Sequence, residues 1–261
     1  QWNALPYSQF DHWIDENRQA HVFRIPAKGG DVEPVTQKFG RELPRSSQSA
    51  SSYDVHPQER LIAFNANGSE NSVDPKIDIF LATIGSDNAE NITPDNQAPD
   101  SSPTFSPDGK SLAFSRQKIH GFYADTARLM VYDLAAKTSR ELTSNWDRSV
   151  SNFVWSNDSR SFFASIDDAG TSRLYQIDAR SGKERAITKD TSFNSPALAS
   201  NVLVATNESF LYPARLVKVD IRNGRTTRLD SFNDELLAKT EFGSYESVTY
   251  KGADGNDIQM W

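Results

Sequence analysis

The sequence predicts an all-β fold of the β-propeller type, in which four-stranded sheets repeat along the chain. The first observation is a hairpin motif at 102–114, whose frame recurs in weaker form at 53–64 and 153–164. The second is a further pair of short strands that follows each hairpin at a regular delay. Units of about 40 to 50 residues with four strands each are typical of propeller blades.

The turn of the best repeat has the chemistry of a tight hairpin. Pro107 fixes a negative φ, Asp108 can accept hydrogen bonds from nearby backbone, and Gly109 accepts a positive φ. Alternating side chains on both sides of the turn predict paired strands. Pro57 and Asn157 occupy the position of Pro107 in the other two copies, so we expect hairpins there as well.

Short turns rich in Gly and Asn join the third and fourth strands, as at 180–183 and 222–225. The last blade lacks the Pro-Asp-Gly turn and has Leu-Ala-Ser-Asn at 198–201. A half-blade with its turn at 28–31 precedes the complete blades. The predicted third strands are 78–81, 128–134, 173–178 and 215–220, and the predicted fourth strands are 91–93, 141–143, 186–188 and 227–229. We therefore expect about four and a half blades and, by analogy, a complete ring of seven or eight.

Composition limits the function. A net charge of −7 without a basic cluster argues against a nucleic-acid partner. No apolar run is long enough to span a bilayer. Because the chain has no cysteine, thiol catalysis, disulfides and cysteine-ligated zinc are excluded within it. The four histidines are scattered, and we expect neither a metal site nor a cofactor.

Several polar groups could suggest a metal, acid–base or phosphate-binding site, but each suits a structural role better. Paired carboxylates can hold metals or transfer protons, yet hairpin turns also require Asp. The glycine pair lacks the strand, helix and spacing of a phosphate loop. We expect turn, structural or solvated roles for Asp108, Asp125, Asp167, Asp168, His56, His120 and the pair Gly29–Gly30.

The C-terminal end predicts a separate hairpin. A mixed stretch at 230–241 is followed by strand-like residues at 245–261, with a turn at 253–256. The hairpin ends in a strand at Trp261, and the chain begins without methionine. We therefore expect a longer protein, with further blades before Gln1 and partner strands after Trp261.

Two features together resemble the domain junction of the prolyl oligopeptidase family of serine peptidases. They are the Ser-Pro-Asp-Gly hairpins and the segment at 248–261, Val-Thr-Tyr-Lys-Gly-Ala-Asp-Gly-Asn-Asp-Ile-Gln-Met-Trp. Within that family the chain is most similar to the acylaminoacyl-peptidase and dipeptidyl-peptidase V branch. Segments at 5–23, 145–150 and 213–216 support this branch. The chain departs from the pattern at 8–10, where Ser-Gln-Phe stands in place of Arg-His-Trp.

The resemblance implies that residues 1–241 form propeller blades, incomplete at the N-terminus, and that 242–261 begin a C-terminal α/β-hydrolase domain. Catalysis in the family belongs to a Ser-Asp-His triad with its serine in Gly-x-Ser-x-Gly. That motif does not occur in this sequence, so we expect no catalytic residue in the chain.

By the same resemblance, the propeller caps the active site of a peptidase and restricts access to short peptides, which the parent enzyme cleaves near their N-terminus. The resemblance also favours a periplasmic or secreted protein and is compatible with a homo-oligomer. The alternative is a non-enzymatic propeller of the TolB kind that binds a protein partner.

Three residues are candidates for substrate contact. Trp146, Asp147 and Arg148 lie in a connection between the fourth strand of one blade and the first strand of the next, which places them at a propeller face. Asp147 could pair with a free α-amine and Trp146 could stack on an apolar side chain. In the alternative interpretation, Asp147 and Arg148 pair with each other or with backbone, and Trp146 wedges between blades.

Overall fold

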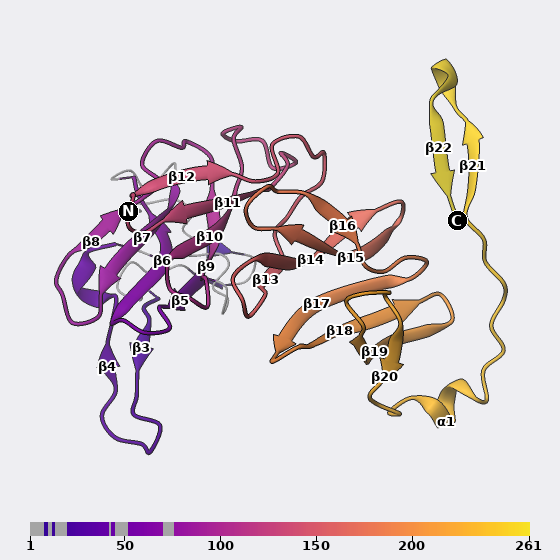
Figure 1. Cartoon of the computed structure of the whole chain (residues 1–261), viewed down its shortest axis with the longest axis horizontal. Helices are drawn as coiled ribbons and strands as arrows, with labels where there is room; N and C mark the ends of the chain where they lie inside the picture. Colours follow the sequence, from indigo (N-terminus) through magenta and orange to yellow (C-terminus); the bar gives the residue numbers. More distant parts are fainter. Residues whose placement is uncertain (1–7, 10–11, 14–19, 42, 45–51, 70–75) are drawn as a thin grey trace. The chain divides into compact units, whose positions relative to one another are not determined.

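The computed structural model describes residues 8–9, 12–13, 20–41, 43–44, 52–69 and 76–261. Within these ranges almost all regular structure is antiparallel strand (Figure 1). The chain divides into two units, 1–144 and 145–261. No helix in the described part of the chain has the length and apolar character needed to cross a membrane.

The first unit contains two four-stranded sheets, preceded by two short hairpins. One sheet comprises β5 (Tyr53–Val55), β6 (Leu61–Asn67), β7 (Ile77–Thr83) and β8 (Ala89–Asn91). The other comprises β9 (Asp100–Phe105), β10 (Ser111–Arg116), β11 (Arg128–Asp133) and β12 (Thr138–Glu141). The short hairpins pair β1 (Ser8–Gln9) with β2 (His12–Trp13) and β3 (Phe23–Arg24) with β4 (Glu33–Pro34), and a 3-10 turn, η1 (Gln37–Phe39), follows.

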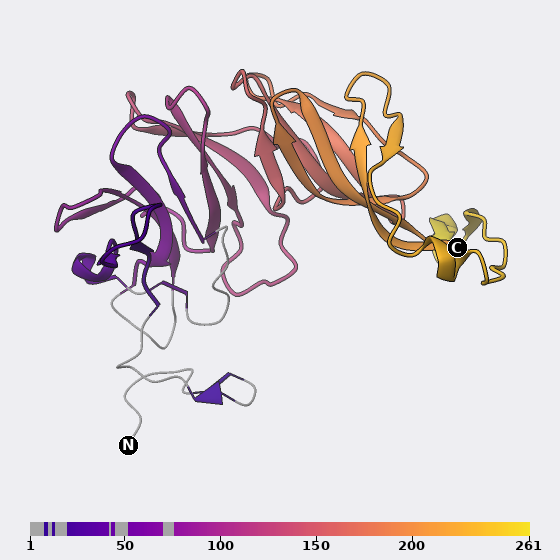
Figure 2. The same ribbon diagram turned by 90° about the horizontal axis from the view of Figure 1, so that it is seen from below.

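The second unit also contains two four-stranded sheets, whose longer strands are clearly seen in Figure 2. The first comprises β13 (Phe153–Trp155), β14 (Ser161–Asp168), β15 (Thr171–Asp178) and β16 (Glu184–Ala186). The next comprises β17 (Ser192–Ala199), β18 (Val202–Ser209), β19 (Tyr212–Val219) and β20 (Thr226–Arg228). The unit ends with α1 (Asp234–Leu237) and the hairpin of β21 (Val248–Lys251) and β22 (Asp257–Met260), joined by η3 (Ala253–Gly255).

Each four-stranded sheet is a meander in which consecutive strands pair, as in a propeller blade. The predicted partial propeller, four blades and a half-blade, is therefore confirmed. The three repeated turns are also equivalent, because the same backbone hydrogen bond closes each of them. It runs from His56 N to Leu61 O, from Ser106 N to Ser111 O and from Ser156 N to Ser161 O, at 2.9, 2.8 and 2.7 Å.

The fourth strands begin and end earlier than the sequence predicted, at 89–91, 138–141, 184–186 and 226–228. The predicted segments at 91–93, 141–143 and 186–188 end in a threonine that lies just beyond the strand. Each threonine is buried, and its Oγ1 accepts a hydrogen bond from the backbone at the third strand. The bonds, each spanning 14 residues, run from Val22 to Thr36 in the half-blade, Ile79 to Thr93, Leu129 to Thr143 and Leu174 to Thr188, at 2.9, 2.9, 3.0 and 2.9 Å.

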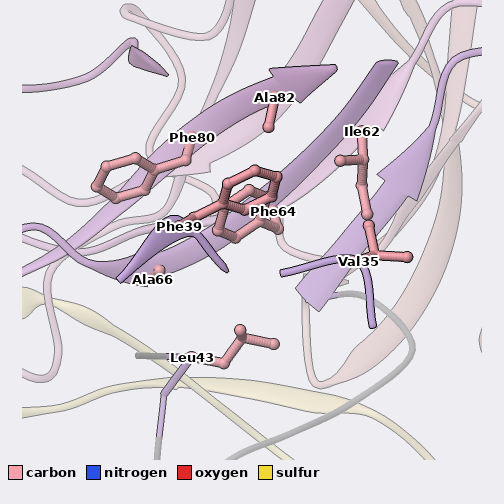
Figure 3. Close-up of a cluster of buried hydrophobic side chains, with 8 residues drawn as sticks. All are labelled: Val35, Phe39, Leu43, Ile62, Phe64, Ala66, Phe80 and Ala82. Carbon is pink, nitrogen blue, oxygen red and sulfur yellow. The ribbon is translucent and has the colours of Figure 1, made fainter. Parts of the chain in front are cut away.

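The core lies between sheets rather than inside one layer. Because neighbouring residues of a strand face opposite sides, Ile62 and Phe64 of β6 pack on one side of their sheet and Ala63 packs on the other. Figure 3 shows the first of these clusters, in which Phe39 stacks on Phe64 at 5.7 Å between ring centroids. Its other members are Val35, Leu43, Ala66, Phe80 and Ala82. Sheets buried on both faces are what stacked blades require.

Substituting Thr143 tests the threonine bond. Thr143→Val keeps the side-chain volume but leaves the N–H of the buried Leu129 without its acceptor, so we expect a loss of about 1–2 kcal/mol in the free energy of unfolding. The measurement is urea denaturation of the chain. Thr143→Ser is the control, because it retains the hydroxyl and should lose less. Equal losses for the two variants would contradict this role.

Candidate substrate-facing surface

One end of each sheet carries the segments that connect blades. Because strands alternate in direction, the connection into the first strand lies at the same end as the turn between the second and third strands. We call this the connection end. In the second unit it carries 145–152, the turn 168–171, the connection 187–191 and the turn 209–212. The Pro-Asp-Gly turn and its counterparts lie at the opposite end of their sheets.

A carboxylate, Asp168, organises the connection end of the sheet β13–β16. Its Oδ2 accepts a hydrogen bond from the Tyr175 hydroxyl at 2.7 Å and pairs with Arg173 Nη1 at 2.9 Å. Its Oδ1 lies 3.3 Å from Arg148 Nη2, and Arg148 Nη1 lies 2.8 Å from Asp147 Oδ1. Arg148 thus bridges a half-buried carboxylate and an exposed one.

Trp146 completes the cluster by packing against Tyr175, with 5.1 Å between ring centroids. The three candidates from the sequence therefore meet in one place. Asp147 pairs with Arg148, as the structural alternative expected, whereas Trp146 packs on a strand of the blade that it precedes. The side chain of Asp147 is 83% exposed, so solvent reaches it despite the ion pair.

Asp168, Arg173 and Tyr175 are cluster members that sequence reasoning missed. Asp168 was assigned only a turn role, but it anchors two guanidinium groups and a phenol. The alternation of side chains along β15 could have revealed two of them, because Arg173 and Tyr175, two residues apart, share one face of the strand beside the turn.

The cluster keeps Asp168 ionised. The hydrogen bond from Tyr175 lowers the pKa of Asp168, and the guanidinium groups of Arg148 and Arg173 lower it further. Burial raises this pKa, but the net effect holds it below its usual range. Burial raises the pKa of Tyr175, and the neighbouring Asp168 carboxylate adds to that effect. At neutral pH the cluster therefore contains a fixed carboxylate and a protonated phenol.

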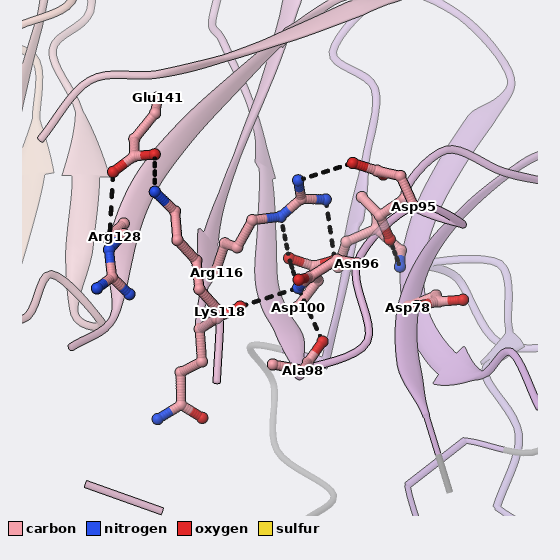
Figure 4. Close-up of polar contacts among 12 residues, drawn as sticks. Asp78, Asp95, Asn96, Ala98, Asp100, Arg116, Lys118, Arg128 and Glu141 are labelled. Carbon is pink, nitrogen blue, oxygen red and sulfur yellow. Dashed lines mark hydrogen bonds and ion pairs between the residues drawn. The ribbon is translucent and has the colours of Figure 1, made fainter. Parts of the chain in front are cut away.

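The first unit has a more deeply buried ion pair at its connection end (Figure 4). Arg116 Nε lies 2.8 Å from Asp100 Oδ1, and its Nη1 lies 3.3 Å from Asp95 Oδ2. Asn96 Nδ2 donates to Asp100 Oδ1 at 3.3 Å and to Gln117 O at 2.9 Å. Burial raises the pKa of Asp100 to about 6, against the opposing effect of Arg116. Asp100, Arg116 and Asn96 satisfy one another inside the protein, which is typical of a structural network, whereas the Asp95 side chain is 72% exposed.

The polar groups that the sequence assigned to structure have such roles. His56 Nε2 donates to Gly109 O at 2.8 Å, and His120 Nδ1 donates to Gln97 O at 2.9 Å. Asp108 accepts the Ser106 hydroxyl at 2.6 Å within its turn. Asp125 accepts hydrogen bonds from Lys118 N and Ile119 N, at 2.5 and 3.0 Å, and pairs with Arg128. Gly29 N donates to Pro26 O in a turn. Among the described residues, no group of three or more His, Asp or Glu side chains could hold a metal ion.

Asp168→Asn tests the cluster. A carboxylate whose folded-state pKa is depressed stabilises the fold above its unfolded pKa, about 3.9, and this stabilisation is lost as pH falls through the folded value. We therefore expect a loss of about 1–2 kcal/mol at pH 7 that shrinks below about pH 4. Urea denaturation from pH 3 to pH 8 measures it.

Asp167→Asn is the matched control for that experiment. Asp167 is adjacent and exposed, and its oxygen accepts the Ser172 hydroxyl at 2.7 Å, a bond that an amide oxygen can keep. We expect little change in stability. A pH-independent loss in Asp168→Asn, or an equal loss in both variants, would contradict the ion-pair cluster.

No protein-family model matches the chain. Curated relatives do. The chain is 26% identical to dipeptidyl-peptidase 5 of Porphyromonas gingivalis over 98% of its own length and 38% of that protein. It is 24% identical to dipeptidyl-peptidase 5 of Porphyromonas endodontalis, again over 98% of the chain and 38% of the relative. It is 27% identical to dipeptidyl-peptidase 5 of Trichophyton equinum, over 80% of the chain and 30% of the relative. The chain thus spans less than two fifths of the length of these relatives.

Solved structures show the same fold. Acylaminoacyl peptidase of Pyrococcus horikoshii has a TM-score of 0.63 and 18% identity, over 84% of this chain and 32% of that one. The β-propeller domain of the Trilobed protease from Pyrococcus furiosus has a TM-score of 0.57 and 20% identity, with coverages of 76% and 56%. A putative TolB from Agrobacterium tumefaciens has a TM-score of 0.58 and 16% identity, with coverages of 79% and 72%. The solved structures confirm the propeller fold, and the curated relatives confirm the predicted resemblance to the dipeptidyl-peptidase V branch.

Proposed function

We propose, from the similarity of 98% of the chain to a dipeptidyl-peptidase 5, that the chain is the propeller of a serine peptidase acting near the N-terminus of short peptides. Residues 1–241 would be the propeller part, and 242–261 would begin the hydrolase domain. The hairpin of β21 and β22 supports that division, since it forms a separate two-stranded sheet after the last blade.

The propeller's role in this proposal is selection rather than chemistry. The sequence contains no Gly-x-Ser-x-Gly, so the nucleophile would lie in another part of the protein. A propeller that covers an active site admits short, flexible peptides and excludes folded chains. The capping role is supported by the resemblance to multi-domain peptidases and by the polar connection end.

Within this proposal, Trp146, Asp147 and Arg148 face the substrate. Arg148 is fixed between Asp168 and Asp147, so its guanidinium holds the Asp147 carboxylate in place. Because the Asp147 side chain is 83% exposed, its outer oxygen can accept a peptide ammonium. The Trp146 ring, held by Tyr175, offers a flat apolar surface beside that position.

A binding propeller of the TolB kind is the second candidate. The putative TolB structure shares the fold, with a TM-score of 0.58. At 16% identity this likeness concerns the fold alone, whereas the sequence similarity to dipeptidyl-peptidase 5 runs through both units of the chain. The peptidase is therefore the better-supported function.

The direct test uses the complete protein encoded by the gene. We expect it to release p-nitroaniline from dipeptidyl or N-acylaminoacyl p-nitroanilides, to lose this activity with a serine-directed phosphonofluoridate, and to leave a folded protein substrate intact. Reading the gene beyond Trp261 should reveal Gly-x-Ser-x-Gly followed by Asp and His. A soluble, folded protein without this motif or activity would favour the binding propeller.

Asp147→Asn tests the substrate contact in that protein. Because the carboxylate is exposed, we expect a modest rise in KM, about fivefold, for substrates with a free N-terminus, with kcat unchanged. N-acylated substrates should be unaffected. Asp87→Asn is the control, since Asp87 is also exposed and also paired with one cation, Lys38, at 3.3 Å. An equal change in the two variants would assign Asp147 a purely structural role.

A further inference from the structure

A second feature of the connection end is a cavity of about 400 Å³ in the second unit. Its walls come from four places: the turn between β14 and β15, the turn between β18 and β19, the connection at 190–192, and the C-terminal segment. Aromatic rings form much of the lining, namely Phe210, Tyr212, Phe242, Tyr245 and Trp261. None of these residues belongs to the cluster around Asp168.

Three of these rings contact one another, which fixes the cavity wall. Phe210 lies 5.0 Å from Tyr245 and 5.8 Å from Trp261, and Tyr245 lies 5.7 Å from Trp261, between ring centroids. The Trp261 indole N–H also donates to Gly170 O at 3.3 Å. Gly170 has φ of +75°, and a Cβ there would lie 2.7 Å from Trp261 Nε1. Only glycine fits this backbone conformation and this approach together.

The charged side chains in the cavity lining, Asp190 and Glu208, are both acidic. The nearby Arg215 is not in the lining, but its Cζ lies 3.5 Å from the ring centroid of Tyr212, so that ring already has a cation on one face. Asn194 Nδ2 donates to Glu208 Oε1 at 3.3 Å, which orients that carboxylate. Lys189 lies 4.0 Å from Asp190, but both side chains are more than three quarters exposed, so the pair is weak. Carboxylates combined with aromatic faces favour an organic cation on an apolar stem.

We propose that this cavity binds the cationic side chain of a lysine residue in a peptide. The four-carbon stem of lysine would pack against the rings, and its ammonium would approach Asp190 and Glu208. The cavity shares Gly170, Thr171 and Ser192 with a neighbouring hollow that Asp168 also lines, so it adjoins the hollow beside that cluster member. The inference rests on the proposed function only in taking the ligand to be part of a peptide.

The test uses two small probes that differ by one group. Nα-acetyl-lysine amide and Nα-acetyl-norleucine amide share the backbone and the aliphatic stem, but norleucine lacks the ammonium. Calorimetric titration of the 261-residue chain should give roughly fivefold or greater preference for the lysine probe. Equal affinities, or no saturable binding of the lysine probe, would overturn the proposal. The 261-residue chain contains no Gly-x-Ser-x-Gly, so we expect it to hydrolyse neither probe, and the result is independent of the peptidase assay.

Variants then locate the site. Asp190→Asn and Glu208→Gln should each weaken the lysine probe about threefold and leave the norleucine probe unchanged. Phe210→Leu should weaken both probes. Glu184→Gln, on the exposed strand β16, is the charge-matched control and should alter neither. Unaltered lysine affinity in Asp190→Asn and Glu208→Gln, with melting curves like that of the parent chain, would place binding elsewhere and reject this cavity.

Discussion

The hydrogen bond from the third strand to a buried hydroxyl just beyond the fourth strand is the contact on which each blade depends. Since Thr36, Thr93, Thr143 and Thr188 all make it over the same 14-residue interval, it fixes the register of the outer strand in the half-blade and in three complete blades. In the last blade the Asp230 carboxylate accepts the same bond from Leu216 N. A fixed register sends alternate residues to opposite faces, and the clusters between sheets follow from it.

Carboxylate–guanidinium contacts recur at the connection ends, with different burial in the two units. The Asp100 side chain is fully buried with Arg116, and neighbouring polar groups complete the network. The Asp168 side chain is 16% exposed, and its partner Arg148 reaches the exposed Asp147, as Arg116 reaches the exposed Asp95. In both units a guanidinium thus joins a covered carboxylate to an exposed one. The guanidinium itself is more exposed in the second unit, at 35% for Arg148 against 10% for Arg116, so a ligand can approach it there.

Much of the fold could be predicted from the sequence, because short-range chemistry determines it. The Pro107–Gly109 turn, the repeat frame and the C-terminal hairpin depend on neighbouring residues. The predicted ends of the fourth strands were wrong. In the sequence, a threonine that bonds through its side chain just beyond the strand looks like one more residue of that strand. For the candidate site, the sequence predicted that Trp146 to Arg148 lie in a connection between two sheets, but it did not predict the role of Asp168. The aromatic cavity depends on a contact across 91 residues, from Gly170 to Trp261, which no local pattern encodes.

The 14-residue interval also has a kinetic consequence. The bond that completes a blade joins two strands of one hairpin, so closing it requires only a short loop and costs little chain entropy. Contacts of low sequence separation form quickly. A ribosome adds about 5–20 residues per second, so the outer hairpin of one blade has time to close before the next blade is complete. The chain is therefore suited to fold vectorially, with each finished sheet serving as a template for its successor.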